Sequence, residues 1–315
     1  MEKHVIVVHG GAGTITKAKM SPENEQYHIS GIEEALKYGD EILKNGGSAL
    51  DAVEAAVKSL EDNPLFNAGR GSVFTHEGKN ELDASIMDGQ TLMAGAVSGV
   101  TNIKNPVSLA RLIMENTSHV LLCGSGALDF ARKMNVVFMP DAYFFTQHRF
   151  DQYLAVYKTD QVQLDHTEGT TDLPNPYIGT AGAVALDKYG NIASATSTGG
   201  MTNKKFGRAG DSPIIGAGTF ANNATCAISC TGHGEFFIRS VVAYDVSCLM
   251  EYKGMNLEAA SNYVIHQKLK SIGGEGGLIA VDARGNIALP FNSEGMYRGY
   301  KRNDEDFNIK IYKES

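Results

Sequence analysis

The chain has 315 residues, of which 43% are hydrophobic and 20% are charged, and its formal net charge is −8. This composition suits a globular protein with a large core, and we expect a single domain over residues 1–315. The acidic balance argues against nucleic acid or a membrane surface as a partner, because both would require a basic face. No zinc-type cysteine cluster, signal peptide or membrane-spanning run is recognisable, so we expect reduced thiols and a cytoplasmic location.

The first predicted elements are a strand and two helices. A β-branched run at residues 5–8 predicts a buried strand, which leads into the glycine run 9–13. That run lacks the glycine spacing of a dinucleotide-binding loop, and we interpret it as a tight turn that exposes backbone N–H groups. An apolar stripe from Ile32 to Leu43 predicts one helix, and a second is expected from Ser48 to Asn63.

Beyond about residue 70 the sequence predicts strands joined by tight hairpins. Residues 184–193 and 279–288 are nearly identical decapeptides, each with an aspartate and a Gly-Asn turn between apolar segments, and residues 76–80 form a looser version. Gly-Asn pairs supply the positive φ that tight hairpins need. Hairpins in unrelated proteins look alike, but two near copies suggest that both halves contribute equivalent strands to one core.

A second pair of helices is predicted near the C-terminus, from the periodicity of residues 237–250 and from Asn256 as the cap of a helix that ends near Lys270. Helices therefore segregate from strands in each half, which predicts an α+β sandwich with antiparallel sheets. From about residue 140 to 179 the periodicity is lost, and we expect a long flexible linker there.

The pair Gly179-Thr180 lies at the border between this linker and a predicted core strand. A threonine hydroxyl is a weak nucleophile, but cleavage of the bond before Thr180 would free an α-amine in the same residue. That amine has an ordinary pKa of about 7.7–8.0, so it can serve as the general base. Four Gly-Thr pairs occur in the chain, and the other three lie inside continuous elements or in a turn. An ordinary strand threonine is the alternative interpretation.

Two groups of polar residues follow. Thr198 ends a strand of alternating Ser and Thr residues and, across a hairpin from Thr180, would orient the nucleophile; a solvent-facing strand is the alternative. Arg208 and Asp211 lie among glycines and would meet the carboxylate and ammonium groups of a free amino acid. A surface ion pair is the alternative for these two residues.

A third group, Thr231-Gly232-His233-Gly234, follows a predicted strand and opens the second helix pair. Backbone N–H groups at a helix start and a threonine hydroxyl are suitable donors to a developing oxyanion. His233 has no acidic partner that the sequence identifies, so we interpret it as a residue that lines the site or supports it.

Taken together, these segments resemble a known family, the plant-type (type III) L-asparaginases with isoaspartyl peptidase activity, in the N-terminal nucleophile (Ntn) hydrolase superfamily. The resemblance covers almost the whole chain and rests on residues 8–13, 63–69, 82–85, 179–187, 196–203, 207–213, 231–235 and 291–298. Ala181 and Phe206 depart from the valine and proline expected there, and neither carries chemistry.

The resemblance implies a fold and a maturation pathway. The fold would be a four-layer αββα sandwich, the Ntn-hydrolase fold, made as an inactive precursor. Autocatalytic cleavage before Thr180 would give an alpha subunit, residues 1–179, and a beta subunit, residues 180–315. A homodimer of the precursor would thereby become an (αβ)2 heterotetramer.

The implied activity is a threonine-type hydrolysis of small molecules, namely of the side-chain amide of L-asparagine and of β-aspartyl (isoaspartyl) dipeptides. Both present a free α-amino and a free α-carboxyl group. A glycosylasparaginase, which cleaves the sugar–asparagine amide, is the alternative within the family. An uncleaved, non-catalytic binding homologue is the alternative from another class.

The resemblance also implies residue roles. Thr180 is the nucleophile, Thr198 supports it, and Asn67 assists the geometry of cleavage after Gly179. The oxyanion hole and the substrate-binding group comprise Thr231, Gly232, Arg208, Asp211, His233 and Gly234. No cofactor is expected for catalysis, but a structural sodium ion is expected on main-chain oxygens of Leu60, Glu61, Asn63, Phe66, Ala68 and Arg70.

Overall fold

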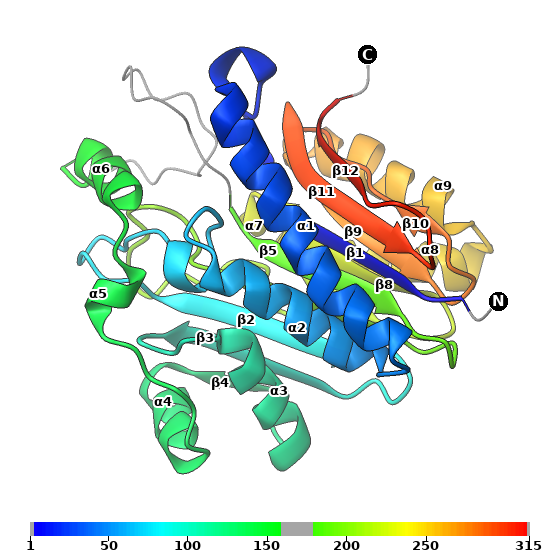
Figure 1. Ribbon diagram of the computed structural model, residues 1–315, viewed down its shortest axis with the longest axis horizontal. Coiled ribbons are helices and arrows are strands. Elements are labelled where there is room, and N and C mark those ends of the chain that lie inside the picture. The colour runs from blue at the N-terminus through cyan, green and yellow to red at the C-terminus, as the bar shows by residue number, and fades with distance from the viewer. Residues whose placement is uncertain (1–2, 159–178, 314–315) are drawn as a thin grey trace.

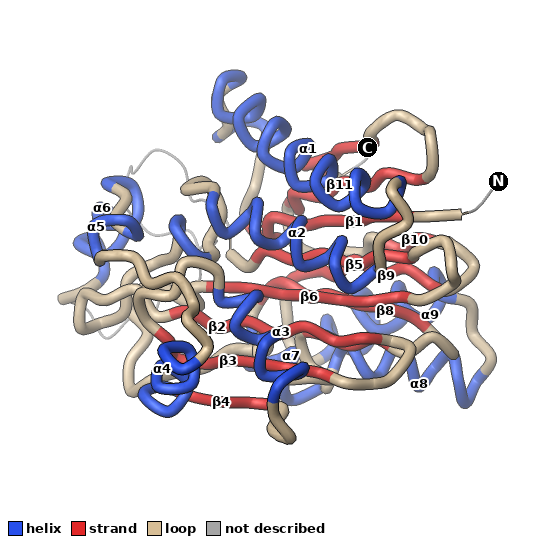
Figure 2. The backbone as a smooth tube through the Cα atoms, turned by 60° about the horizontal axis from the view of Figure 1, so that its bottom comes forward, coloured by secondary structure: helices blue, strands red, loops and turns tan. Residues whose placement is uncertain are grey.

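The computed structural model describes residues 3–158 and 179–313, which form two β-sheets packed face to face between layers of helices (Figures 1 and 2). The larger sheet has eight strands in the order β12-β11-β1-β5-β6-β2-β3-β4, and the smaller has four in the order β10-β9-β8-β7. This arrangement is the αββα sandwich of the Ntn-hydrolase fold, which confirms the α+β class expected from the sequence.

The strands of the larger sheet are β1 (Val5–Gly13), β2 (Leu82–Asp88), β3 (Ala94–Val100), β4 (Leu121–Cys123), β5 (Ala181–Leu186), β6 (Ile192–Thr198), β11 (Gly295–Arg302) and β12 (Asn308–Tyr312). The smaller sheet contains β7 (Thr219–Ala221), β8 (Cys226–Gly232), β9 (Gly276–Asp282) and β10 (Ile287–Ala288). Every pairing is antiparallel except that of β3 with β4. The hairpin β5–β6 lies at the centre of the larger sheet.

Helices cover the outer face of each sheet (Figure 2). On the larger sheet lie α1 (Pro22–Lys44), α2 (Ala49–Asp62) and α3 (Pro106–Asn116), with α4 (Gly124–Lys133) beside β4. On the smaller sheet lie α7 (Gly234–Ser240), α8 (Val242–Lys253) and α9 (Leu257–Tyr263), which continues into a π-helical segment, Val264–Leu269. Two short 3₁₀ turns span Lys17–Lys19 and Gly69–Gly71. The sequence did not predict α3 and α4.

The predicted caps account for where the helices begin. At the start of α2 the Ser48 hydroxyl accepts a hydrogen bond from the Asp51 amide at 3.1 Å and donates one to its carboxylate at 2.7 Å. This is a capping box, and it satisfies an N–H group that the first helical turn leaves unpaired. The predicted helices over residues 32–43 and 48–63 are therefore confirmed, with α1 beginning earlier, at Pro22.

The two near-identical decapeptides both form hairpins, but one lies in each sheet. The first is β5–β6, and the second is β9–β10. Gly190 and Gly285 hold the expected positive φ, at 86° and 82°. The looser copy at residues 76–80 is a turn, in which the Gly78 amide donates to the Thr75 carbonyl at 3.0 Å, and it forms no hairpin because β2 follows it but no strand directly precedes it.

The glycine run 9–13 is not the tight turn that we expected. It is the second half of β1, which remains paired with β11 through Gly13 and contains a bulge between His9 and Gly11, and φ at Gly11 is 112°. Its neighbours supply the ladder hydrogen bonds that keep it extended. Gly10 is required for packing, because a Cβ there would overlap the Phe66 ring.

The prediction of a flexible linker from about residue 140 to 179 is wrong for the first part of that range. Residues 141–156 contain two helices, α5 (Asp141–Phe144) and α6 (Gln147–Val156). Phe150 and Tyr153 of α6 pack on Phe74, and the buried Arg149 donates from Nε to the Gly71 carbonyl at 2.9 Å. These contacts are tertiary, so the local pattern does not reveal them. Residues 159–178 of the predicted linker lie outside the described residues.

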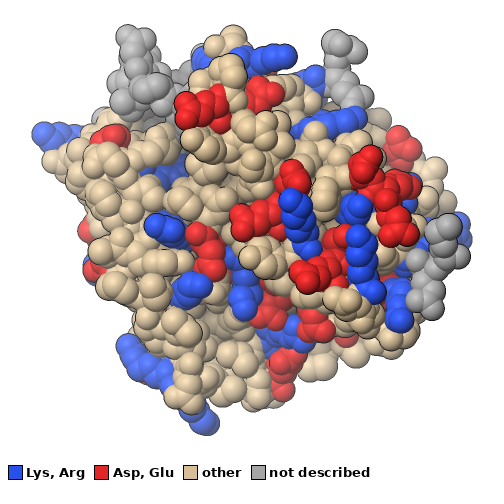
Figure 3. Space-filling view, viewed as in Figure 1, with Lys and Arg blue, Asp and Glu red and all other residues tan. Residues whose placement is uncertain are grey.

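The molecular face formed by α1 and α2 carries interspersed charges of both signs (Figure 3). Ion pairs one helical turn apart, such as Lys37–Glu33 at 2.7 Å and Lys44–Asp40 at 2.9 Å, account for part of this mixture. Such exposed pairs contribute little to stability. Among the helices of the described ranges, none is long and apolar enough to cross a membrane.

Candidate active site

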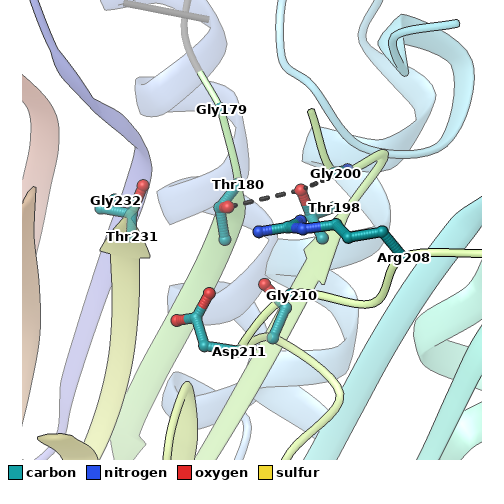
Figure 4. A pocket seen from close by; sticks show the side chains of 10 residues that line it. Gly179, Thr180, Thr198, Gly200, Arg208, Gly210, Asp211, Thr231 and Gly232 are labelled. Carbon is teal, nitrogen blue, oxygen red and sulfur yellow. Dashed lines mark hydrogen bonds between the residues drawn. The ribbon is translucent and has the colours of Figure 1, made fainter. Parts of the chain in front are cut away.

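A pocket lies where the ends of three strands and one loop meet (Figure 4). The start of β5, the end of β6, the end of β8 and the loop that follows β6 each contribute to it. Its lining consists of Gly179, Thr180, Thr198, Gly200, Arg208, Gly210, Asp211, Ser212, Thr231 and Gly232. The fold thus gathers most of the sequence-predicted site residues, although they come from segments far apart in the chain.

Thr180 is buried at the entrance to β5 and has a strained backbone. Its φ is +33°, in the left-handed region that a β-branched residue rarely adopts, and such a conformation costs about 1–3 kcal/mol. The Thr180 hydroxyl donates to the Thr198 hydroxyl at 3.3 Å. The Thr198 oxygen also accepts from the Gly200 amide at 3.0 Å, which fixes its position. The predicted pairing across the β5–β6 hairpin is therefore present.

Asn67 connects the loop after α2 to the turn that follows Thr198. Its side-chain amide donates to the Gly200 carbonyl at 2.8 Å, and its backbone carbonyl accepts from the Gly199 amide at 3.0 Å. The Asn67 side-chain oxygen accepts from the Val73 amide at 3.0 Å. Asn67 is fully buried, so these bonds hold the end of β6 beside Thr180 without a direct contact with the pocket.

Arg208 lies in the pocket wall and has a partner that the sequence analysis did not assign. Its Nε and Nη2 atoms donate to the two carboxylate oxygens of Glu235, at 2.8 and 2.9 Å. This side-on arrangement leaves the Nη1–Nη2 edge of the guanidinium for a second carboxylate. The surface ion pair with Asp211 that we kept as an alternative is not the arrangement observed, because Arg208 pairs with Glu235.

Asp211 is buried, and its Oδ2 atom has no hydrogen-bond partner among the described residues. Burial raises the pKa of this carboxyl to about 7, and the nearby Arg208 guanidinium opposes that shift. Gly234 allows the two groups to converge, since a Cβ at Gly234 would lie 2.9 Å from both Arg208 Nη2 and Asp211 Oδ1. A buried carboxylate with a free oxygen is suited to receive a cationic group.

Thr231 and Gly232 end β8 on the other side of Thr180 from Thr198 (Figure 4). The Thr231 oxygen accepts from the Ala12 amide at 3.3 Å, so its own hydrogen is available to donate. Gly232 has a φ of 151°, and a Cβ there would overlap the Glu275 carbonyl. These two residues occur where oxyanion donors were expected, although they end a strand and α7 begins only at Gly234.

His233 does not line the pocket. It is the N-cap residue of α7, with Nε2 3.5 Å from a Glu235 carboxylate oxygen and its ring edge-on to Phe236. Burial lowers its pKa, and Glu235 opposes that shift. The geometry gives His233 a supporting position next to the residue that holds Arg208.

The last turn of α2 and the loop that follows it carry the oxygens expected to bind sodium. A Cβ at Gly69 would lie 2.5 Å from the Glu61 carbonyl oxygen, and a Cβ at Gly71 would overlap the Phe66 carbonyl oxygen. The loop therefore folds tightly on its own main-chain oxygens, which suit a hard cation that exchanges water for carbonyl ligands. Within residues 3–158 and 179–313, no cluster of three His, Cys, Asp or Glu side chains could hold a metal ion.

Comparisons with known proteins identify the family of the chain. A protein-family model described as "Asparaginase" matches residues 2–311. The chain belongs to the asparaginase family. An isoaspartyl peptidase of Salmonella typhimurium is 51% identical over 314 residues, which cover 100% of both chains. An isoaspartyl peptidase of Escherichia coli is 50% identical over 314 residues, covering 100% of this chain and 98% of the relative.

The similarity extends to archaeal members of the asparaginase family. A plant-type L-asparaginase of Pyrococcus horikoshii is 46% identical over 303 residues, which cover 94% of this chain and 96% of the relative. The coverage is nearly complete in all three comparisons, so the whole αββα sandwich falls within the matched region. The family resemblance found in the sequence motifs is confirmed.

Proposed function

We propose that this member of the asparaginase family is an autocatalytically processed hydrolase with Thr180 as its nucleophile. The observation that carries the proposal is the state of Thr180, which combines a strained positive φ with a hydroxyl aligned by Thr198. In the precursor, the Thr180 oxygen would attack the Gly179 carbonyl carbon and displace the peptide nitrogen. Water would then hydrolyse the resulting ester and leave a free α-amine on Thr180.

The same hydroxyl then serves in turnover. The new α-amine takes the hydroxyl proton as the Thr180 oxygen attacks the substrate amide carbon. The oxyanion of the tetrahedral intermediate receives hydrogen bonds from the Thr231 hydroxyl and the Gly232 amide. The amine leaving group departs with a proton returned by the α-ammonium of Thr180, and water hydrolyses the acyl-enzyme.

Arg208 and Asp211 support L-asparagine and β-aspartyl dipeptides as the substrate class. The free edge of the Arg208 guanidinium would bind the substrate's α-carboxylate, and the unpartnered Asp211 oxygen would bind its α-ammonium. Both substrates carry these two charged groups beside the amide carbonyl. The names of the relatives, isoaspartyl peptidase and plant-type L-asparaginase, agree with this assignment.

Intact-mass measurement of the purified protein tests the processing step. We expect fragments 1–179 and 180–315 of about 19 and 15 kDa, in proportion to their shares of the 33.8 kDa chain. A single full-length species after prolonged incubation at neutral pH would contradict the proposal and favour an uncleaved binding homologue.

Rates on three compounds test the substrate class: L-asparagine, β-Asp-Leu and GlcNAc-Asn. We expect hydrolysis of the first two. Preferential hydrolysis of GlcNAc-Asn would identify a glycosylasparaginase instead. N-acetyl-asparagine should be a very poor substrate, because it leaves the Asp211 carboxylate without a cation.

Three further elements of the proposal rest mainly on the family resemblance. Carbonyl oxygens of the last turn of α2 and of the loop after it, including those of Glu61 and Phe66, would hold a sodium ion that stabilises the position of Asn67. The two-chain protomers would assemble as an (αβ)2 heterotetramer, which size-exclusion chromatography with light scattering can test. The cytoplasmic location stays a prediction from the sequence.

A further inference from the structure

A row of buried hydroxyl groups crosses the space between the two sheets. Ser85 donates to Thr219 at 2.7 Å, Thr219 donates to Thr196 at 2.6 Å, and Thr196 and Ser229 share a hydrogen bond of 2.6 Å. The Ser229 hydroxyl lies 2.9 Å from Nε2 of His9. All five side chains are fully buried, in a layer that is otherwise largely apolar.

One end of this row lies beside the nucleophile. His9 pairs in the sheet with Gly182 of β5, two residues after Thr180, and its buried Nδ1 atom has no hydrogen-bond partner among the described residues. Gly182 leaves the space for this contact, because a Cβ there would overlap both the Ser229 hydroxyl and His9 Nε2. Burial lowers the pKa of His9 to about 3, so the ring is neutral when the enzyme works.

The other end lies at the substrate-binding loop. The Ser85 hydroxyl is 2.6 Å from the carbonyl oxygen of Ser212, the residue after Asp211. Thr219 lies 3.4 Å from the same carbonyl oxygen. The row therefore runs from the His9 ring, beside Gly182 and two residues from Thr180, to the backbone next to Asp211, through groups that have no access to water.

We propose that this hydroxyl chain is a positioning device that holds the nucleophile and the substrate-binding loop in register. Each hydroxyl has one proton, so Thr219 and the Ser212 carbonyl share the proton of Ser85. When Thr219 then donates to Thr196 and Thr196 to Ser229, Ser229 donates to His9 Nε2 and the ring proton is placed on Nδ1. The inference rests on the proposed function, because it takes Thr180 as the nucleophile and Asp211 as the ammonium-binding group.

The two ends predict different kinetic effects. Ser85→Ala frees the Ser212 carbonyl, so KM for asparagine should rise about 3- to 10-fold, the range expected for one lost hydrogen bond. Cleavage before Thr180 should slow less than in Ser229→Ala, because cleavage does not use Asp211 and Ser85 lies at the far end of the chain from His9. Ser229→Ala frees His9, so cleavage should slow and kcat should fall by a similar factor. Ser194→Ala is the matched control.

The control is well matched because Ser194 is fully buried on β6, the strand that carries Thr196. The Ser194 hydroxyl donates to the Ile228 carbonyl at 2.6 Å and does not belong to the chain. Ser194→Ala should change stability without changing KM, kcat or the cleavage rate. A comparable change in KM, kcat or the cleavage rate in Ser194→Ala would show that loss of any buried hydroxyl of the core has this effect, and it would overturn the proposal.

Coupling between the ends is the decisive measurement. In the double variant of Ser85→Ala and Ser229→Ala, the loss of kcat/KM should fall short of the product of the single losses by about threefold or more. The reason is that the second substitution acts on a chain that is already broken. Independent, multiplicative losses would overturn the proposal. Thr196→Ser keeps the hydroxyl and should retain wild-type kinetics. Thr196→Val removes the hydroxyl and should lose them.

Measurements on the uncleaved protein separate this proposal from the proposed function. In the Thr180→Ala background, unfolding free energies of the same Ser85 and Ser229 variants should show the same non-additivity, and ¹⁵N NMR should find the His9 proton on Nδ1. A proton on Nε2 would overturn the direction of the chain. Cleavage of the Thr180→Ala protein itself would overturn the proposed function while leaving the coupling measurement valid.

Discussion

The hairpins β5–β6 and β9–β10 share their turn and differ at their open ends. In each turn one aspartate oxygen accepts two backbone hydrogen bonds: Asp187 from Tyr189 and Asn191, and Asp282 from Arg284 and Asn286, all at 2.9–3.0 Å. Glu275 stands as far before Asp282 as Thr180 stands before Asp187. Of these two positions, Thr180 is the one that has a strained φ and an aligned hydroxyl and that lines a pocket.

The difference shows that a turn depends on its own residues, whereas a reactive strand end depends on its neighbours. Thr180 lies between Thr198 on β6 and Thr231 on β8, and Asp211 lies below it (Figure 4). Glu275 instead lies exposed at the surface before β9, where its carbonyl accepts from the His233 amide at 3.0 Å. Equivalent local sequences thus acquire different roles from their places in the two sheets.

The largest effect is expected at the open ends. Thr180→Ala should abolish cleavage and lower amidase activity by about 10³-fold or more, because both reactions use its hydroxyl. Glu275→Ala, at the matching position of the other hairpin, should be cleaved and active at wild-type rates. Gel analysis and asparagine turnover measure both outcomes. Loss of cleavage in the Glu275→Ala variant would contradict the difference in role between the two positions.

A pH profile tests the charge that faces Thr180. Burial raises the pKa of Asp211 to about 7, so its carboxylate becomes protonated and loses the substrate ammonium as the pH falls. We expect kcat/KM for asparagine to fall up to about tenfold per pH unit below 7, with the Thr180 α-amine adding to the loss. A flat profile between pH 5.5 and 7 would contradict both the raised pKa of Asp211 and the use of the Thr180 α-amine as the general base.

Stability measurements isolate Asp211 from the α-amine. A folded-state pKa above the ordinary value of 3.8 means that the Asp211 carboxyl destabilises the fold increasingly as the pH rises from about 4 to 7. In the uncleaved Thr180→Ala protein, which has no free amine on residue 180, Asp211→Asn should therefore raise Tm more at pH 8 than at pH 5. An equal change at both pH values would contradict the raised pKa.

Two glycines at matching positions sharpen the comparison further. Gly182 precedes Asp187 by as much as Gly277 precedes Asp282. A Cβ at Gly182 would overlap the polar His9–Ser229 contact, whereas a Cβ at Gly277 would lie 2.5 Å from the Phe291 Cβ. Each change to alanine should cost about 1–3 kcal/mol by overpacking, as measured by chemical denaturation. Only Gly182→Ala should also slow cleavage, and equal slowing in both would contradict this.

The smallest difference is expected at the turns. Asp187→Asn and Asp282→Asn should both weaken the turn, but Asp187 Oδ2 also accepts from the Ala49 amide at the start of α2, at 3.1 Å. Asp187→Asn should therefore cost about 1 kcal/mol more, since it removes a charge-assisted cap. Both variants should be processed normally. Equal losses of stability would show that the cap contributes nothing.

The sequence alone determined the elements whose signals are local. Ser48 and Asp51 cap α2 as predicted, and Asp187 and Asp282 each begin a hairpin turn, because these hydrogen bonds join residues close together in the chain. The pairing of Thr180 with Thr198 followed from one such hairpin. Most of the pocket-lining residues were also named in advance, through the order of motifs along the whole chain.

Tertiary structure decided everything that depends on partners remote in sequence. The glycine run in β1 is extended because β11 pairs with it as far as Gly13, and α6 is held by Arg149 and aromatic contacts with the loop around Phe74. Glu235 holds Arg208 across 27 positions of the chain, and His9 reaches Ser229 across 220. Local periodicity carries no information about such contacts, because they form only when segments remote in the sequence pack together.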